Sequence, residues 1–167
     1  EQRAFCWMTS YVYSYFMTTT PVAEAYPETV TLPDHEGTLV KFDVYIPPDE
    51  VRQIVRSVAS GIAAEAKKRK QAPRLVGVLF GAIVFLDALS IELNDLNVRH
   101  TTDTIHVTRY GSSMIGGNVD IHKDLDNPDI TDEWVVIVED IKEGGKTLEA
   151  AQGMFETRGA SDVQIAV

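Results

Sequence analysis

The sequence predicts an α/β fold in which a central parallel β-sheet is flanked by helices. Segments typical of strands alternate with segments typical of helices, and this alternation is characteristic of parallel sheets covered on both faces. Two strand segments, residues 75–79 (LVGVL) and 135–138 (VVIV), are continuous apolar runs, as expected for strands buried on both faces. A length of 167 residues is enough for one domain with a proper core.

Composition and charge exclude several classes of protein. A hydrophobic content of 44% with 24% charged residues is typical of a globular protein rather than a disordered or membrane-spanning one. The net charge of −10 argues against a nucleic-acid surface, which needs clustered Lys and Arg. An anionic ligand would therefore need local devices such as helix dipoles, a few lysines or bound cations. Cys6 is the single cysteine, which excludes an internal disulfide in this chain and predicts a cytoplasmic protein.

The N-terminal part of the chain is predicted to differ from the rest. Residues 1–28 are expected to be an irregular segment, and residues 29–167 to form the domain. Residues 1–16 are rich in aromatic side chains without a clean period and lack the features of a signal peptide. Two readings of residues 1–16 stay open: translated upstream sequence outside the natural domain, with Met17 as the ordinary start, or a real strand or interaction arm.

The first regular elements are a strand and a long helix. Residues 38–46 alternate enough to be a strand, which Pro47 and Pro48 end. Asp49 and Glu50 then place negative charge in the first turn of a helix, where the helix dipole favours it. Its apolar stripe has helical spacing and comprises Val51, Ile54, Val55, Val58 and Ile62. The basic residues 67–70 end this helix; a solvated C-terminal turn is favoured over a nucleic-acid patch because the whole chain is acidic.

The remaining elements follow in regular order. After the strand at 75–79, Phe80 and Gly81 turn the chain into a mostly buried helix at 82–93. The next elements are predicted to be a strand at 104–108, a flexible Gly/Ser-rich loop at 110–118, a return strand at 119–122 and a polar connection at 123–133. The last are a strand at 135–139, a helix at 146–158 capped by Gly159, and a strand from residue 162.

The segment 135–148 (VVIVEDIKEGGKTL) carries the candidate chemistry. A buried strand ends in the acidic pair Glu139 and Asp140, and a glycine-rich turn then opens a helix. The unpaired N–H groups of such a turn lie at the positive end of the helix, where phosphate binds. The carboxylates would repel phosphate and suit sugar hydroxyls, a divalent metal or proton transfer. The turn and the carboxylates together predict that the ligand is a phosphorylated sugar. A Walker A loop is rejected because Asp140 stands where that motif needs glycine.

Segment 135–148 resembles the phosphoribosyl-pyrophosphate motif of type I phosphoribosyltransferases, and its Glu-Asp pair resembles the hypoxanthine-guanine branch. Supporting segments are RLVGVLFGAIVFLDALS from Arg74, RYGSS from Arg109 and IHKDLDNPDITDEWVVIVED from Ile121. The resemblance extends in order from about Val40 to Val167, so it is more specific than a lone phosphate loop. It implies purine salvage: transfer of phosphoribosyl from phosphoribosyl pyrophosphate to N9 of a 6-oxopurine, with Mg²⁺ as cofactor.

The resemblance also implies a role for each matching residue. Glu139 and Asp140 would bind the ribose hydroxyls and, largely through the substrate, Mg²⁺. Ile141 would pack against the purine, Glu143 would be the general base, and Tyr110 would belong to a closing lid. The 5′-phosphate would bind in the glycine-rich turn, at Gly144, Gly145, Lys146 and Thr147. The pyrophosphate would bind against the loop after residue 79, at Phe80 and Gly81. The family usually forms homodimers or homotetramers.

The sequence departs from the family pattern at several points. Glu143 replaces an aspartate, Lys142 an apolar residue, and Phe80 a Lys or Arg. The base-reading segment of the family would follow Val167, so we expect the C-terminal part of the family fold to be missing from this chain. These departures leave a second function open: a catalytically impaired nucleotide-binding or regulatory relative.

Overall fold

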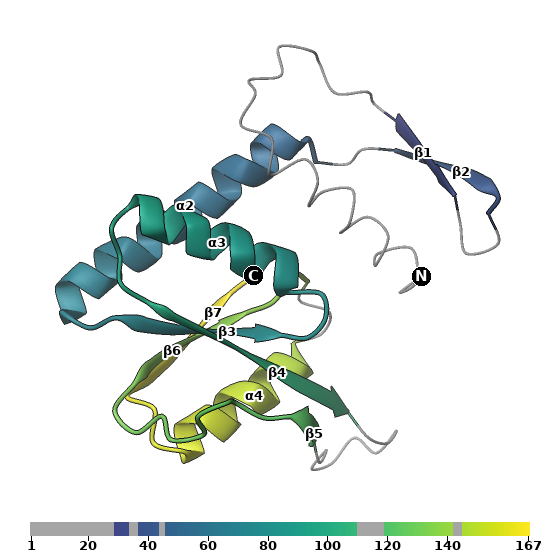
Figure 1. Ribbon diagram of the computed structural model, residues 1–167. Coiled ribbons are helices and arrows are strands. Elements are labelled where there is room, and N and C mark those ends of the chain that lie inside the picture. The colour runs from purple at the N-terminus through teal and green to yellow at the C-terminus, as the bar shows by residue number, and fades with distance from the viewer. Residues whose placement is uncertain (1–28, 34–36, 44–45, 110–118, 142–144) are drawn as a thin grey trace. The chain divides into compact units, whose positions relative to one another are not determined.

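The structure, a computed structural model, describes residues 29–33, 37–43, 46–109, 119–141 and 145–167 (Figure 1). The predicted N-terminal segment 1–28, the predicted loop 110–118 and residues 142–144 lie outside these ranges. The chain divides into two compact units, Glu1–Ile54 and Val55–Val167.

The first unit contains a two-stranded antiparallel sheet and the start of a helix. Strand β1 (Thr29–Pro33) pairs with β2 (Leu39–Asp43). The strand expected at 38–46 is confirmed in β2, while β1 was not predicted. Helix α2 (Pro48–Arg69) begins here with the predicted acidic first turn, in which Asp49 accepts a 2.7 Å hydrogen bond from Arg52.

The second unit is built on a five-stranded sheet in the order β5-β4-β3-β6-β7. The pairs β3–β4, β3–β6 and β6–β7 are parallel, so the predicted parallel sheet is confirmed. The edge strand β5 differs, because it runs antiparallel to β4. The strands are β3 (Pro73–Val78), β4 (Thr101–Arg109), β5 (Val119–Lys123), β6 (Trp134–Val138) and β7 (Asp162–Ala166).

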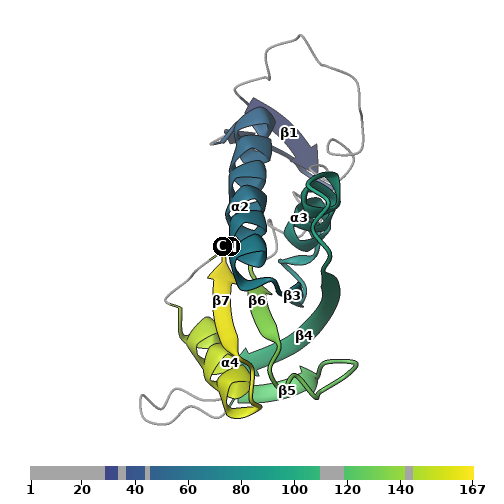
Figure 2. The same cartoon turned by 90° about the vertical axis from the view of Figure 1, so that its left-hand side faces the viewer.

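Helices cover both faces of this sheet, as Figure 2 shows. Helix α4 (Lys146–Thr157) packs on one face through Leu148, Ala151 and Phe155. Helix α3 (Ile83–Asp95) and the Ala59–Ile62 stretch of α2 pack on the other. Alternate residues of each inner strand supply the two cores: Val135 and Ile137 of β6 lie under α4, and Val136 and Val138 lie under α2 and α3. Complete burial of β6 accounts for its uninterrupted apolar sequence.

Helices α2 and α4 end in the same backbone arrangement, a residue with positive φ followed by a backbone hydrogen bond to the last turn. After α4, Gly159 adopts φ +89°, and the N–H of Ala160 donates to the carbonyl of Phe155 at 3.2 Å. The cap predicted at Gly159 is therefore confirmed. After α2, Lys70 adopts φ +55°, and the N–H of Gln71 donates to the carbonyl of Ala66 at 3.3 Å.

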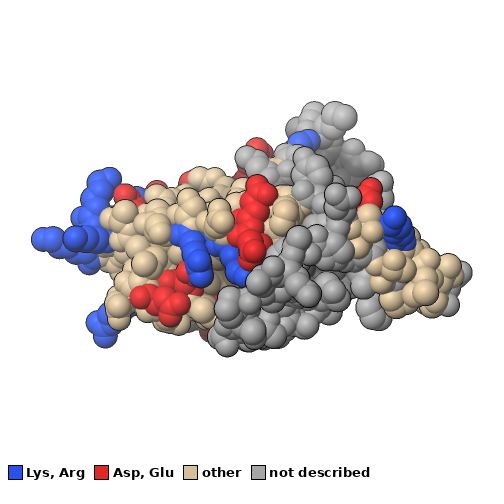
Figure 3. All heavy atoms as spheres, turned by 90° about the horizontal axis from the view of Figure 1, so that it is seen from above, with Lys and Arg blue, Asp and Glu red and all other residues tan. Residues whose placement is uncertain are grey.

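Basic side chains gather at the C-terminal end of α2 (Figure 3). They are partly neutralised there. Arg69 contacts Glu65 and Asp162, each at 2.8 Å, and its guanidinium lies 4.8 Å from the centre of the Trp134 ring. Lys68 lies 3.4 Å from Glu65. These pairs agree with a helix end rather than a nucleic-acid patch. Within the described part of the chain, no helix has both the length and the apolar character of a membrane span.

Candidate functional site

The two loops predicted to carry the chemistry lie side by side at the carboxyl edge of the sheet. β3 and β6 are parallel neighbours, and Gly77 pairs with Val138 at their ends. The chain leaves β3 through α3 on one face and leaves β6 through α4 on the other (Figures 1 and 2). Such a switch point opens a crevice between the two loops, and it is where open α/β sheets bind their ligands.

The acidic pair lies at this edge of the sheet, directly after β6. The N–H of Glu139 donates to the carbonyl of Ala166 at 3.1 Å, so Glu139 still belongs to the edge of the sheet. The N–H of Asp140 donates to Oε1 of Glu139 at 3.1 Å. Both side chains are half-buried, because the wholly apolar strand β6 ends directly before them. The strand therefore delivers two carboxylates to a partly desolvated edge.

Burial has an electrostatic consequence for Glu139. Desolvation, reinforced by a hydrogen bond to the Asp140 carboxyl, raises the pKa of Glu139 to about 8. The N–H of Asp140 acts in the opposite direction but does not outweigh these effects. Burial therefore favours the protonated form of Glu139 in the unliganded protein. A divalent cation or a hydroxyl donor at the pair would favour the ionised form.

Gly81 brings the other loop into contact with Asp140. A Cβ atom built on Gly81 would lie 2.5 Å from both carboxylate oxygens of Asp140, a separation that real Cβ atoms do not show. Any other residue at this position would force the carboxylate to move. The peptide bond between Leu79 and Phe80 is cis, and Phe80 is 68% exposed. The turn predicted at Phe80 and Gly81 is confirmed.

The glycine-rich turn ends in a left-handed residue. Gly145 is buried and has φ +68°. As the residue before the first turn of α4, it offers no side chain to cap the helix. α4 begins at Lys146, so the turn is not part of a continuous helix. Lys146 is exposed and Thr147 half-buried in the first turn, where backbone N–H groups have no partner within the helix. Glu143 and Gly144 lie outside the described residues.

The structure thus brings together part of the predicted site. Glu139, Asp140 and Gly81 converge, and Ile141 follows them with 44% of its side chain exposed. Tyr110, like Glu143 and Gly144, falls outside the described ranges. Across the described residues, no cluster of three or more His, Cys, Asp or Glu side chains has the arrangement of a metal site.

The KDLD segment has a supporting role that sequence reasoning missed. Asp103 is 9% exposed and accepts bonds from Arg74 (3.3 Å) and from the N–H of Asp126 (3.1 Å). Asp124 accepts two bonds from the Arg158 guanidinium, at 2.6 and 2.8 Å, which lower the pKa of its carboxyl. These pairs tie the connection before β6 to β4 and to the end of α4. The alternation of charge and leucine in KDLD was the available signal.

A phosphoribosyltransferase domain model matches residues 49–167 of the chain. The hypoxanthine phosphoribosyltransferase of Buchnera aphidicola is 34% identical over 123 residues, which are 73% of this chain and 67% of that protein. The chain belongs to the hypoxanthine phosphoribosyltransferase family of type I phosphoribosyltransferases. The hypoxanthine phosphoribosyltransferase of Escherichia coli is 32% identical over 124 residues, which are again 67% of that protein.

Solved structures agree with this family assignment. A hypoxanthine phosphoribosyltransferase from Trypanosoma cruzi, studied for the role of its C-terminal region in oligomeric state and activity, superposes with a TM-score of 0.66. It is 30% identical, and the match covers 71% of this chain and 64% of that one. The phosphoribosyltransferase chain described here therefore spans about two thirds of the length of such relatives.

Proposed function

We propose that the protein works in purine salvage and transfers the phosphoribosyl group of phosphoribosyl pyrophosphate to N9 of hypoxanthine or guanine, with release of pyrophosphate. The observation that carries the proposal is the contact between Gly81 and Asp140. It joins an acidic pair, suited to hydroxyls, to a main-chain loop at the switch point of a phosphoribosyltransferase fold. Membership of the family, with hypoxanthine phosphoribosyltransferases among the relatives, supports the choice of substrates.

The anionic ends of the substrate are assigned to main-chain groups. The 5′-phosphate would bind in the turn formed by Gly144, Gly145, Lys146 and Thr147, because the free N–H groups of the first turn of α4 and the Lys146 charge attract it. The pyrophosphate would lie against the backbone of Phe80 and Gly81. An acidic chain can bind a polyanion in this way without a basic surface.

The carboxylates are assigned to the sugar and the metal. Glu139 and Asp140 would accept hydrogen bonds from the ribose hydroxyls and contact Mg²⁺, either directly or through bound water. Two half-buried carboxylates fit this ion, which prefers oxygen ligands and usually takes the rest of its shell from substrate and water. When bound, Mg²⁺ would neutralise charge on the departing pyrophosphate. Because burial raises the pKa of Glu139, binding of a cation or a hydroxyl donor there would be coupled to proton release.

The remaining assignments concern the base and the lid. Ile141, which is exposed at the site, would pack against the purine ring. Glu143 would act as general base near N7, and Tyr110 would belong to a loop that shields the reacting sugar carbon from water. We further propose that the protein acts in the cytoplasm and forms homodimers or homotetramers.

A coupled spectrophotometric assay with phosphoribosyl pyrophosphate, Mg²⁺ and each purine base tests the proposal on full-length protein. Nucleotide should form with hypoxanthine or guanine, and the double variant Glu139→Gln, Asp140→Asn should abolish it. Asp95→Asn changes an exposed carboxylate at the other end of α3 and is the matched control, with expected wild-type rates. Absence of product with hypoxanthine, guanine and xanthine would refute the proposal. Binding of phosphoribosyl pyrophosphate without turnover would instead favour the impaired, regulatory relative.

A further inference from the structure

We propose that His106 and His122 extend the site and contact the diphosphate group of its substrate. The inference rests on the proposed function for the nature of the ligand. The observation that carries it is a pair of imidazole rings, one from β4 and one from β5, in the ribbon that these two strands form. The His106 ring packs against Phe80 in the loop that meets Asp140, and the His122 ring packs against His106. Spacing along the sequence did not connect these histidines with any site.

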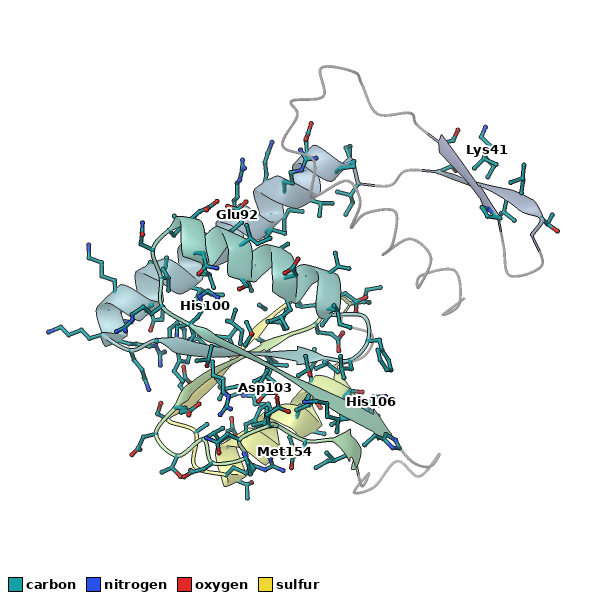
Figure 4. All side chains as sticks on the ribbon, in the orientation of Figure 1. Lys41, Glu92, His100, Asp103, His106 and Met154 are labelled. Carbon is teal, nitrogen blue, oxygen red and sulfur yellow. The ribbon has the colours of Figure 1, made fainter. Side chains whose placement is uncertain are left out.

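The ribbon lies at the edge of the sheet where the site is. β3 ends at Val78, which pairs with Ile105, but β4 continues to Arg109. β5 pairs only with this continuation, from His106 to Arg109. The N–H of Leu79 donates to the carbonyl of Ile105 at 2.8 Å. His106 is therefore level with the start of the loop that contains Phe80 and Gly81, and Figure 4 shows it at this end of β4.

A β-bulge places the second imidazole. His106 pairs with Lys123 and Val107 with Ile121, so His122 is an extra residue in the register of β5. Bulges change the direction of a side chain and are frequent beside functional sites. Here the rings of His106 and His122 lie 5.0 Å apart, centre to centre. Lys123 is directed elsewhere, to the carbonyl of Thr104 at 2.7 Å and to Asp126 at 3.1 Å.

Phe80 connects the imidazole pair to the loop. Its ring meets His106 edge to face, with 5.3 Å between centres. The next residue, Gly81, touches the Asp140 carboxylate. The contacts thus run from the histidine pair through the loop to the acidic pair. A diphosphate group bound along the backbone of Phe80 and Gly81 would have the imidazoles within its surroundings.

Charge favours this assignment. Among the described residues near the ribbon, Arg74 and Lys123 already contact carboxylates, while Asp140 adds negative charge beside Gly81. Histidine can gain a proton near neutral pH and then donates from both ring nitrogens. The ribbon also contains Arg109 and Asp120, whose side chains are not among those that the structure describes.

The competing reading is that the rings only pack together. The variants His106→Phe and His122→Phe distinguish the two readings, because each keeps an aromatic ring and removes the ionisable nitrogens. His106→Gln is a second variant in case Phe perturbs folding. His100→Gln is the control, since His100 contacts Ser90 and the Val98 carbonyl before β4 begins.

Isothermal titration of the full-length protein with inorganic pyrophosphate and Mg²⁺ provides the test. The double Phe variant should lose about tenfold in affinity near pH 6 and little near pH 8.5, because only protonated imidazole forms a charge-assisted bond. Comparison with wild type at each pH removes the ligand's own titration. The net number of protons exchanged on binding, measured in two buffers, should shift toward release in the Phe variants, because the release from Glu139 stays and the uptake by imidazole is lost, and it should stay unchanged in His100→Gln.

The outcomes separate this inference from the proposed function. Wild-type affinity and proton exchange in both Phe variants would overturn the inference, while nucleotide synthesis by the wild type would leave the function standing. Loss of pyrophosphate affinity in the variants of a protein that makes no nucleotide would support the histidine contact and remove the catalytic assignment. Failure of the wild type to bind pyrophosphate would overturn both.

Discussion

Replacing Gly81 by alanine tests the contact on which the site depends. The added Cβ would lie 2.5 Å from both oxygens of the Asp140 carboxylate, whereas ordinary contact needs 3.4 Å or more. The carboxylate must therefore retreat by about 1 Å, and a misplacement of that size can lower a rate by about two orders of magnitude. We expect Gly81→Ala to reduce kcat/KM for nucleotide formation about 100-fold.

The same substitution should affect folding much less. The carboxylate is the end of a short side chain and can rotate away, at a cost of about 1 kcal/mol for a displaced rotamer. Gly61→Ala and Gly153→Ala are matched controls, because a Cβ at these helical glycines meets nothing within 4 Å. Both controls should keep full activity and gain roughly 0.5–1 kcal/mol of stability.

A double-mutant cycle gives the decisive measurement. If Gly81→Ala acts by displacing Asp140, its effect on kcat/KM should nearly vanish in an Asp140→Ala background. Activity of Gly81→Ala within twofold of wild type, or the same loss with and without the Asp140 carboxylate, would refute the reasoning.

Three further predictions concern stability. The pKa of Glu139 is raised in the folded state, so the native protein binds more protons than the unfolded chain between the ordinary carboxyl range and about pH 8, and its stability falls as pH rises through that window. In urea denaturation, Glu139→Gln should therefore stabilise the unliganded protein more at pH 8 than at pH 5. A difference between variant and wild type that does not depend on pH would contradict this. Asp103→Ala removes one of the two carboxylates that Arg74 contacts and leaves the N–H groups of Thr104 and Asp126 without their acceptor in a nearly buried place, so it should cost about 3 kcal/mol. Asp126→Ala, whose side chain is 86% exposed, should cost under about 0.5 kcal/mol. Equal urea midpoints for the two variants would count against the proposed network. Lys70→Gly should raise stability by about 1 kcal/mol because Lys70 holds φ +55° at the end of α2; calorimetry showing a lower Tm would exclude this explanation.

Much of the fold follows from short-range pattern. The strands β3 and β6 were predictable because burial on both faces demands uninterrupted apolar residues. The cap at Gly159 followed equally well, because glycine is one of the few residue types that tolerate a positive φ, whereas the positive φ of Lys70 was not predicted. β1 was missed, since its five residues, TVTLP, carry too little pattern before they pair with β2. β4 was predicted too short for a related reason: its ends are defined by pairing with β3 and β5.

The sequence by itself determined the candidate chemistry and the family resemblance, because an acidic pair, a glycine turn and a helix start are contiguous in the chain. Only the tertiary structure decided which distant groups meet them. The approach of Gly81 to Asp140 depends on β3 and β6 being neighbours, and the meeting of His106, His122 and Phe80 depends on a bulge in an antiparallel pair. The burial of Asp103 among cations likewise comes from packing. Local backbone preferences act over a few residues, while sheet register and burial are settled by the whole core at once.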